Sequence, residues 1–325
     1  MPLSESPEMP KLHIGLPVYN GQDYLAQALD SLLAQTFSDF EIILSDNGST
    51  DDTWTIAQDY ARRDPRIKIM RVEENRGAAW NWNNTFAHAT APYFKWASHD
   101  DLHDPHHLER CLAVLEQEPS VVLCYTAVRF IDADGHPIES EAGKAIIGGR
   151  RSDGCHLRQA KPHQRLRGYF GRYPMHVDFG VIRREALART RGLGSYAGAD
   201  RILIAELVLQ GQIYEIDEEL FIRRLHMTMS WTQGMSEQEY AVWYDPRNAA
   251  RKSRPRLKRG VELVRGIAHA HLPHWEALRS YAEAAQFIVW NHGARRVRRK
   301  VGAVLRKVIR LGHADQEQGS FKEQE

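Results

Sequence analysis

The segment Lys95-Trp96-Ala97-Ser98-His99-Asp100-Asp101 decides how the rest of the chain is interpreted. The apolar and aromatic run at residues 93–97 predicts a short buried strand, which ends directly before two adjacent carboxylates. Pro105, followed by apolar residues at helical spacing, predicts that a helix begins soon afterwards. We therefore expect Asp100 and Asp101 in a loop at the carboxyl end of a strand, where open α/β sheets bind their ligands.

Adjacent carboxylates repel each other unless a positive charge lies between them. A divalent cation that also holds a phosphate-bearing substrate would supply that charge, because hard cations prefer oxygen ligands. The paired acids therefore indicate a metal-assisted reaction on such a substrate.

Three strand–helix units precede this segment. Apolar runs predict strands at residues 12–18, 40–44 and 67–70. Helical spacing predicts a first helix that begins at about Leu25, a second that ends at about Arg62 and a third that ends at about Ala89. This order predicts an α/β fold with a mostly parallel, Rossmann-like sheet that is flanked by helices and has right-handed crossovers. Phosphate-type ligands belong at the strand–helix turns of such a sheet.

The second half of the chain is less regular. Its expected elements are a helix at 108–116, a strand at 121–125, a loop-rich stretch at 133–160, a strand at 176–182, a helix from Arg184, a strand at 212–216 and a basic loop at 223–230. Asp200 stands just before the apolar-periodic residues that begin at Ile202. It is therefore expected at a helix N-terminus that faces the sheet.

Composition limits the function classes. The net charge of the 325 residues is only +1, which argues against a nucleic-acid partner. Three cysteines without metal-binding spacing, together with no recognisable signal peptide or apolar run of about 18 residues, favour a cytoplasmic protein. Residues 251–310 carry sixteen Lys/Arg and three Asp/Glu, which indicates a basic C-terminal region.

We expect three parts from this pattern. They are a catalytic domain at residues 1–235, a basic helical extension at 236–312 and a disordered polar tail at 313–325. The extension has an apolar stripe beside a dense Arg/Lys face at residues 297–310, and three interpretations stay open. It packs on the catalytic domain, contacts another protein, or lies on the inner face of an anionic membrane.

Four motifs in order carry a family resemblance: Pro-Val-Tyr-Asn at 17–20, Ser-Asp-Asn-Gly-Ser-Thr-Asp at 45–51, Glu-Asn-Arg-Gly at 74–77, and the Asp pair at 100–101. Together they resemble the family 2 glycosyltransferases of the GT-A fold. The resemblance implies inverting transfer of a sugar from a nucleotide-sugar donor to an acceptor hydroxyl, with Mn²⁺ or Mg²⁺ as cofactor. It further implies a glycan or lipid-linked acceptor, in the biosynthesis of a surface polysaccharide or a similar glycan.

The resemblance also assigns roles to residues. Asp200 inherits the role of catalytic base, and Asp101 with His226 the role of metal ligands, with Asp101 favoured over Asp100 as the direct ligand. The chain departs from the family pattern at Ser98 and Ala199, where acids are usual. The residues expected to bind the nucleotide sugar are Pro17, Tyr19, Asn20, Asp46, Asn47, Gly77, Asp100 and Arg224.

Two other functions stay open at this point. The missing acids at Ser98 and Ala199 are also compatible with a non-catalytic module that binds nucleotide sugars. The histidines between His99 and His107 have the ligand types of a metal-dependent hydrolase. The donor base, the sugar, the acceptor and the oligomeric state do not follow from the sequence.

Overall fold

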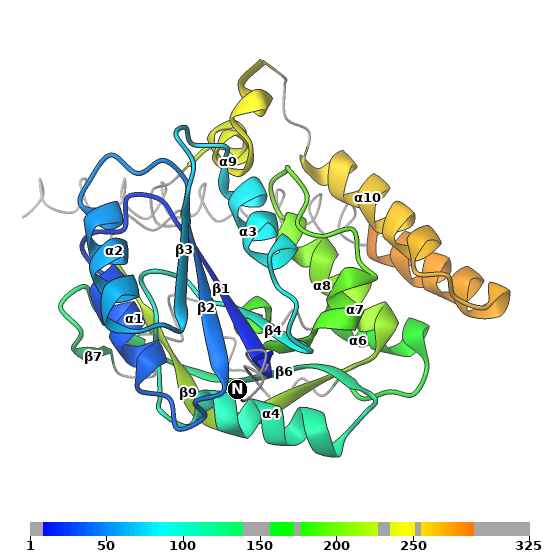
Figure 1. Ribbon diagram of the computed structural model, residues 1–325. Helices are drawn as coiled ribbons and strands as arrows, with labels where there is room; N and C mark the ends of the chain where they lie inside the picture. Colours follow the sequence, from blue (N-terminus) through cyan, green and yellow to red (C-terminus); the bar gives the residue numbers. More distant parts are fainter. Residues whose placement is uncertain (1–8, 139–156, 172–175, 227–234, 251–254, 289–325) are drawn as a thin grey trace, which may run out of the picture. The chain divides into compact units, whose positions relative to one another are not determined.

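The computed structural model describes residues 9–138, 157–171, 176–226, 235–250 and 255–288 (Figure 1). Its first half confirms the predicted strand–helix units. The four strands β1 (Leu12–Val18), β2 (Phe40–Asp46), β3 (Ile67–Arg71) and β4 (Tyr93–Trp96) are parallel and lie in the order β3-β2-β1-β4. The carboxyl ends of β1, β2 and β4 therefore share one edge of the sheet.

Three helices connect these strands. They are α1 (Leu25–Leu33), α2 (Thr53–Arg63) and α3 (Ala78–Ala87). Figure 1 shows α1 and α2 on one side of the strands and α3 on the other, as right-handed crossovers require when the strand order reverses after β3.

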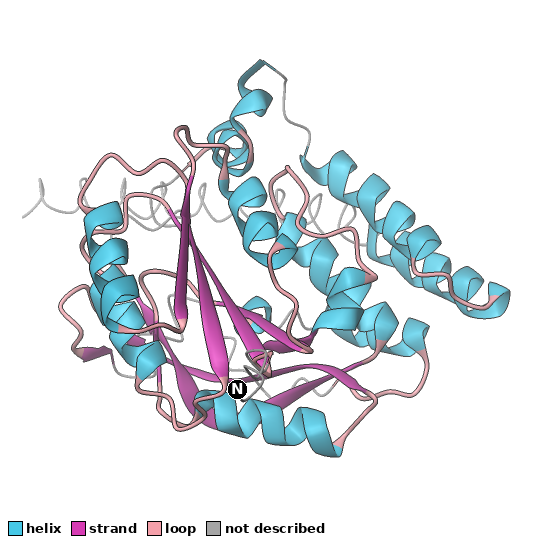
Figure 2. Cartoon of the chain, viewed as in Figure 1, coloured by secondary structure: helices cyan, strands magenta, loops and turns pink. Residues whose placement is uncertain are grey.

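Five further strands, in both antiparallel and parallel pairs, extend this parallel half. The strands are β5 (Leu102–His103), β6 (Val121–Ile131), β7 (Pro137–Ile138), β8 (Val181–Arg183) and β9 (Gln212–Arg224). β8 pairs antiparallel with β4 and with β6, β6 runs parallel to β9, and the short β5 pairs antiparallel with β9 (Figure 2). This last pairing brings the chain just after Asp101 to the C-terminal end of β9.

Two expectations for the second half were wrong. Residues 176–182 do not form one strand, because a turn of 3₁₀-helix, η1 (Val177–Phe179), precedes β8. The segment from Arg223 does not begin as a loop, because Arg223 and Arg224 are the last residues of β9. Residues 227–230 lie outside the described residues.

The remaining helices follow in the second half of the chain. They are α4 (His107–Gln117), α6 (Pro162–Gly171), α7 (Arg184–Ala188), α8 (Ala199–Gln210), α9 (Glu237–Tyr244), η2 (Pro246–Ala250) and α10 (Pro255–His269), and residues 274–288 are also helical. None of the helices in the described ranges is long and apolar enough to cross a membrane.

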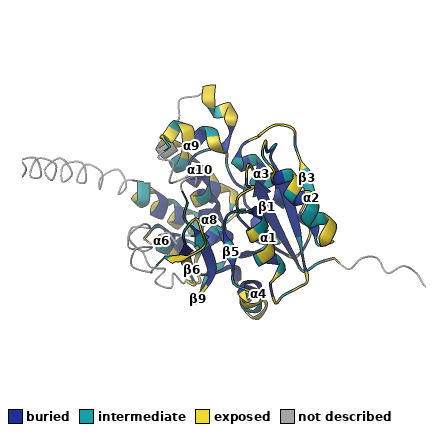
Figure 3. Ribbon diagram, turned by 90° about the vertical axis from the view of Figure 1, so that its left-hand side faces the viewer, coloured by how far each residue is buried: buried dark blue, intermediate teal, exposed yellow. Residues whose placement is uncertain are grey.

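The core follows from the apolar pattern of the sequence. All seven residues of β1 are buried, and α1 turns Leu25, Leu29 and Leu32 toward the sheet at spacings of four and three residues (Figure 3). Each such side chain contributes about 1.5–3 kcal/mol when it is fully buried.

The chain divides into two compact units, residues 1–280 and residues 281–325. α9 and α10, which begin the predicted C-terminal extension, belong to the first unit. The apolar and basic stripe at residues 297–310 and the polar tail at 313–325 lie outside the described residues.

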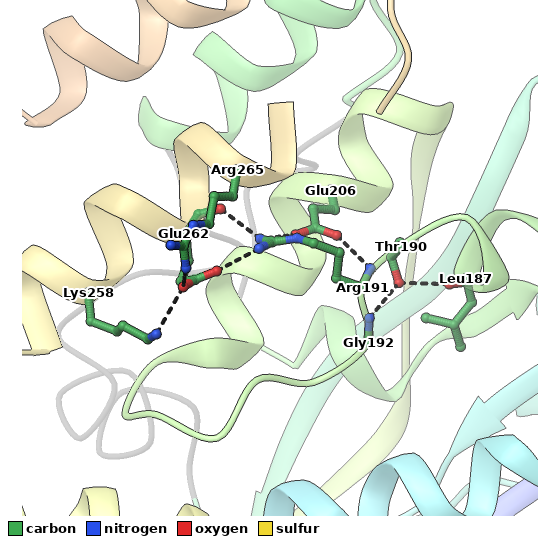
Figure 4. Close-up of polar contacts among 8 residues, drawn as sticks. All are labelled: Leu187, Thr190, Arg191, Gly192, Glu206, Lys258, Glu262 and Arg265. Atoms are coloured by element: carbon green, nitrogen blue, oxygen red, sulfur yellow. Dashed lines mark hydrogen bonds and ion pairs between the residues drawn. The ribbon is translucent and has the colours of Figure 1, made fainter. Parts of the chain in front are cut away.

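An ion-pair network joins α10 to α8 through the preceding loop (Figure 4). Arg191 lies between two carboxylates, with its Nε 2.8 Å from Glu206 Oε1 and its Nη1 2.5 Å from Glu262 Oε2. The side chains of Glu206 and Glu262 are only 4% and 8% exposed. Lys258 and Arg265, also on α10, hold Glu262 from the other side at 3.0 and 2.8 Å.

Replacing Arg191 with Ala should lower the free energy of unfolding by about 3 kcal/mol, because it leaves the buried Glu206 carboxylate without its countercharge. Chemical denaturation measures the change. The matched control is Arg62→Ala, which breaks an exposed pair with Asp59 and should cost less than about 1 kcal/mol. Equal losses in the two variants would contradict the structural role of the Arg191 network.

Candidate functional site

The turns after β1 and β2 are joined by hydrogen bonds of Asn20. Its backbone N donates to Ser49 Oγ at 2.9 Å, and its side-chain Oδ1 accepts from the backbone N of Thr50 at 2.9 Å. Asn20 adopts a left-handed conformation with φ of 51°, which Asn tolerates better than most residues. Tyr19 beside it is 42% exposed, whereas Pro17 is buried in β1 opposite Ser45. The two turns thus form one surface at the edge of the sheet.

Asp46 and Asn47 hold a third segment to this surface. The fully buried Asp46 accepts from Ser49 N at 3.0 Å and faces Arg71 Nε at 3.1 Å. Asn47 donates to the carbonyl of Gly77 at 3.2 Å and accepts from the backbone N of Arg76 at 3.0 Å. These contacts bring the predicted donor-binding residues Pro17, Tyr19, Asn20, Asp46, Asn47 and Gly77 to one region.

Gly77 supports this region through its backbone. Its φ is 88°, and a Cβ atom there would lie 2.5 Å from the carbonyl oxygen of Tyr244 and 2.8 Å from Pro246 Cδ. Gly77→Ala should therefore lower the free energy of unfolding by about 2 kcal/mol or more, as strained backbone positions do. Thermal or chemical unfolding measures this. The control is Gly171→Ala, because a Cβ atom there would meet nothing within 4 Å. It should change the free energy of unfolding by less than about 1 kcal/mol. Similar losses in both variants would contradict the requirement for glycine at position 77.

The carboxylate doublet lies where β5 meets β9. Asp101 is fully buried, and its Oδ1 accepts from the backbone N of Arg224 at 3.0 Å. Its Oδ2 lies 3.5 Å from Arg223 Nη1 and has no hydrogen-bond partner among the described residues. Burial raises the pKa of Asp101 to about 7, although the positive charge of Arg223 opposes that shift.

Asp100 has a different environment. Its Oδ2 lies 3.0 Å from Nε2 of His226, and its Oδ1 accepts from the hydroxyl of Ser98. Burial alone would raise its pKa, but the bond from His226 and the nearby positive charges lower it well below the usual value. The His226 ring packs against Tyr24, with 4.7 Å between the ring centres. Asp100 is thus the acid that contacts His226, whereas the expectation from the sequence paired His226 with Asp101.

Arg224 and Arg223 differ in what they contact. Arg224 is fully buried, lies over the Tyr24 ring and donates to the Asp100 carbonyl, to Gln27 at 2.6 Å and to Ala133 O at 3.0 Å. These contacts fix the backbone of the Asp100 loop. Arg223 is 16% exposed in its side chain and interacts with Asp100, Asp101 and Asp178. Arg223 is therefore the arginine that faces both groups of acids.

Asp200 lies in the first turn of α8, as expected from the sequence. Its Oδ1 accepts from the hydroxyl of the buried Tyr244 at 3.2 Å. Asp200 also repels Asp178, whose pKa is raised to about 6, first by burial and then by this repulsion. Asp178 therefore interacts both with Asp200 and with Arg223, which also interacts with Asp100 and Asp101.

Three residues of this arrangement were not predicted: Arg223, Asp178 and Lys95. Lys95 is fully buried in β4, donates to the carbonyl of Phe179 and has its pKa lowered to about 7 by burial. A lysine inside an apolar strand was the available signal for it. Asp178, an acid inside the strand-like run of residues 176–182, offered the same kind of signal.

The residues present suit a divalent cation bound with a substrate. Asp100 and His226 offer a carboxylate and an imidazole, both ligand types for Mn²⁺, and cations that bind phosphates often use only one or two protein ligands. Asp101 Oδ2, which has no hydrogen-bond partner among the described residues, adds a buried carboxylate oxygen nearby.

The structure does not assemble the histidine cluster of the hydrolase alternative. His106 is exposed and faces Glu109, whereas the His103 and His107 rings lie 5.0 Å apart in the core, where burial lowers their pKa values. The described residues bring only Asp132, Asp134 and His136 within 4.8 Å as three potential ligands, and Asp132 there accepts backbone bonds of an exposed turn.

Comparison with known proteins agrees with this geometry. The sequence profile of glycosyl transferase family 2 matches residues 13–190. The putative teichuronic acid biosynthesis glycosyltransferase TuaG of Bacillus subtilis is 32% identical over 130 residues, which cover 40% of this chain and 51% of TuaG. The chain therefore spans about half the length of such curated relatives.

Two solved structures share the fold. Residues 1–349 of S. aureus TarS, in complex with UDP, match with a TM-score of 0.59 and 16% identity over 87% of this chain and 72% of that one. The mannosyltransferase PcManGT of Pyrobaculum calidifontis, in complex with GDP-Man and Mn²⁺, matches with a TM-score of 0.51 and 16% identity. The match covers 89% of this chain and 81% of the mannosyltransferase chain. These likenesses show the GT-A fold.

Proposed function

Because the chain belongs to the family 2 glycosyltransferases, we propose that it transfers a sugar, with inversion, from a nucleotide-sugar donor to an acceptor hydroxyl. The observation that carries the proposal is the convergence at one edge of the sheet. There Asp100 contacts His226, Arg223 interacts with Asp100, Asp101 and Asp178, and Asp178 interacts with Asp200.

The donor nucleotide is assigned to the surface formed by the first two turns. Exposed Tyr19 and the Asn20–Ser49 and Asn20–Thr50 contacts offer an aromatic face and a fixed backbone for the base and ribose. Asp46 and Asn47 keep that backbone in place. UDP in the TarS complex and GDP-Man in the PcManGT complex support a nucleoside diphosphate sugar as the ligand class and leave its base to the experiment.

We assign the metal to Asp100 and His226 rather than to Asp101. Asp101 already accepts a hydrogen bond from the backbone N of Arg224 and faces the Arg223 side chain. Its role is therefore to shape the loop that carries Asp100. Mn²⁺ or Mg²⁺ bound there would neutralise the departing nucleoside diphosphate. Arg223 adds positive charge on the same side, whereas Arg224 positions the Asp100 backbone.

Asp200 is proposed as the base. In one displacement the acceptor oxygen bonds to the anomeric carbon, the bond from that carbon to the phosphate oxygen breaks, and its electron pair stays on the diphosphate. The acceptor proton passes to the Asp200 carboxylate. The Tyr244 hydroxyl holds that carboxylate in place. A single base suits an inverting reaction.

The acceptor is proposed to be a glycan or a lipid-linked glycan in polysaccharide biosynthesis. The likeness to TuaG, whose name places it in teichuronic acid biosynthesis, supports this class. Contact of the basic C-terminal segment with a membrane or a partner protein remains a proposal from its composition.

The test is a panel of UDP-, GDP-, dTDP- and CMP-sugars with Mn²⁺, with Mg²⁺ and with EDTA. One donor should raise the Tm only when metal is present, since a ligand at 100 times its Kd adds about 2.7 kcal/mol to the stability. The same donor should release its nucleotide during turnover, as a nucleoside diphosphate from a UDP-, GDP- or dTDP-sugar and as CMP from a CMP-sugar. Binding without turnover on any glycan acceptor would support the non-catalytic module, and no binding at all would overturn the proposal.

A further inference from the structure

We propose that Tyr24, at the start of α1, is a positioning residue of the candidate metal site, and that its ring holds the His226 imidazole in the orientation in which it faces Asp100. The inference rests on the proposed function and deepens it, because it adds to the site a residue that lies outside the four sequence motifs. Tyr24 acts through His226 and is assigned no contact with substrate or metal.

One side of α1 is turned toward the segments that carry the candidate metal ligands. Tyr24, Gln27 and Ser31 follow one another at spacings of three and four residues, which places them along one side of a helix. Gln27 Oε1 accepts from Arg224 Nη2 at 2.6 Å. Ser31 Oγ accepts from the backbone N of His103 at 3.2 Å. This side of α1 therefore supports the chain next to both candidate ligands.

The Tyr24 ring contacts two side chains from the end of β9. Its centre lies 4.7 Å from the centre of the His226 ring, with an angle of 48° between the planes, and 4.6 Å from the Arg224 guanidinium. The His226 side chain is only 7% exposed, and its Nε2 lies 3.0 Å from Asp100 Oδ2. An imidazole packed in this way cannot change its rotamer without displacing the ring beside it.

Tyr24 itself stands on fixed backbone. Its backbone N donates to the carbonyl of Gly21 at 3.2 Å, and its own carbonyl accepts from the backbone N of Ala28 at 3.0 Å. Gly21 is buried, and its backbone N donates to Thr53 Oγ1 at 2.8 Å. A Cβ atom at Gly21 would lie 2.6 Å from His99 Cδ2, so α1 begins in close contact with the loop of the carboxylate doublet. Side chains on such fixed elements orient a site more precisely than side chains on free loops.

The contact with Arg224 explains why an aromatic side chain is needed. A guanidinium is attracted to the face of an aromatic ring. Arg224 is fully buried and donates through Nε to the carbonyl of Asp100 at 3.1 Å, so its own position is fixed. The ring of Tyr24 is thereby held at a set place relative to the Asp100 loop. An aliphatic side chain would fill part of the same space without this attraction, whereas a phenylalanine ring would keep it.

The test measures the Kd of Mn²⁺ without any sugar nucleotide, by electron paramagnetic resonance of the free ion. Tyr24→Leu and Tyr24→Met remove the ring and keep an apolar, helix-forming side chain, so poor folding of one variant does not decide the result. Each should raise the Kd of Mn²⁺ about tenfold, as loss of a group that orients a metal ligand does. Tyr24→Phe should stay within about threefold of wild type, because its ring attracts Arg224 in the same way.

Two further variants separate positioning from a general effect on α1. Tyr60 on α2 donates to Asp30 Oδ1 at 2.7 Å and to the carbonyl of Ala26 at 3.1 Å, so it supports another part of α1. Tyr60→Leu should lower the Tm and change the Kd of Mn²⁺ by less than about twofold. In a His226→Ala background, Tyr24→Leu should also change that Kd by less than about twofold, because a positioning residue has no effect once the group that it positions is gone.

Four results would overturn the inference. They are an unchanged Kd of Mn²⁺ in both Tyr24→Leu and Tyr24→Met, an equal rise in Tyr60→Leu, an equal effect of Tyr24→Leu with and without His226, and wild-type protein that binds no Mn²⁺. Failure of the proposed function gives a different result. Wild-type protein would then turn over no donor in the panel, while the Kd of Mn²⁺ would still respond to Tyr24 as expected.

Discussion

Replacing Asp200 with Asn should lower kcat for glycosyl transfer by about 10²–10⁴-fold, the usual contribution of a general base. The amide keeps an oxygen that can accept from the Tyr244 hydroxyl, so the fold of the α8 N-terminus should persist. It cannot take the acceptor proton. The Kd of the donor, measured by calorimetry with Mn²⁺, should stay within about twofold of wild type.

The control for this variant is Tyr244→Phe, which removes the hydroxyl and leaves the carboxylate. Its kcat should fall by about tenfold or less, because Asp200 keeps its chemistry and loses only one positioning contact. If Asp200→Asn retained most of its activity, Asp200 would be only a helix N-terminal acid, and Asp178 would become the candidate base.

The first half of the fold could be predicted because its signals are local. The apolar runs of β1, β2 and β4 and the spacing of Leu25, Leu29 and Leu32 identify each element within about ten residues of sequence. Their parallel direction then follows from the alternation of strands with helices. No contact distant in sequence is needed for this half.

The second half depends on contacts that no local pattern carries. β5 consists of two residues and exists because Leu102 and His103 pair with Ile222 and Phe221 of β9, more than a hundred positions later. η1 interrupts a run with strand-like composition because the carbonyl of Phe179 is held by Lys95 and Gly180 packs against Cys124. Tertiary contacts therefore override propensity at both places.

The same distinction applies to the site. Asn20, Asp46, Asn47, Asp100 and Asp200 lie at strand ends or at a helix start, so topology alone predicts their position. The different environments of Asp100 and Asp101 could not be predicted, since adjacent acids look equivalent in sequence. Only the pairing of β5 with β9 turns one toward the Arg224 backbone and the other toward His226.

This difference makes the two acids separable by mutation. Asp100→Ala should abolish the metal-dependent rise in Tm with the donor and lower kcat by about 10²–10³-fold, as loss of a group that stabilises developing charge does. His226→Ala should weaken the dependence of turnover on Mn²⁺ by about 10- to 100-fold, which is less than the loss in Asp100→Ala, because one of the two ligands remains. Thermal unfolding with and without Mn²⁺ and the rate of nucleoside diphosphate release measure these effects.

Asp101→Asn is the matched comparison, since its amide oxygen can still accept from the backbone N of Arg224. Its Mn²⁺ dependence should stay within about threefold of wild type, because the side chain shapes the loop without binding the metal. Turnover should fall much less than in Asp100→Ala, through small shifts of the Asp100 loop. The opposite result, with metal dependence lost in Asp101→Asn and kept in Asp100→Ala, would make Asp101 the ligand and assign the contact with His226 to positioning of Asp100 alone.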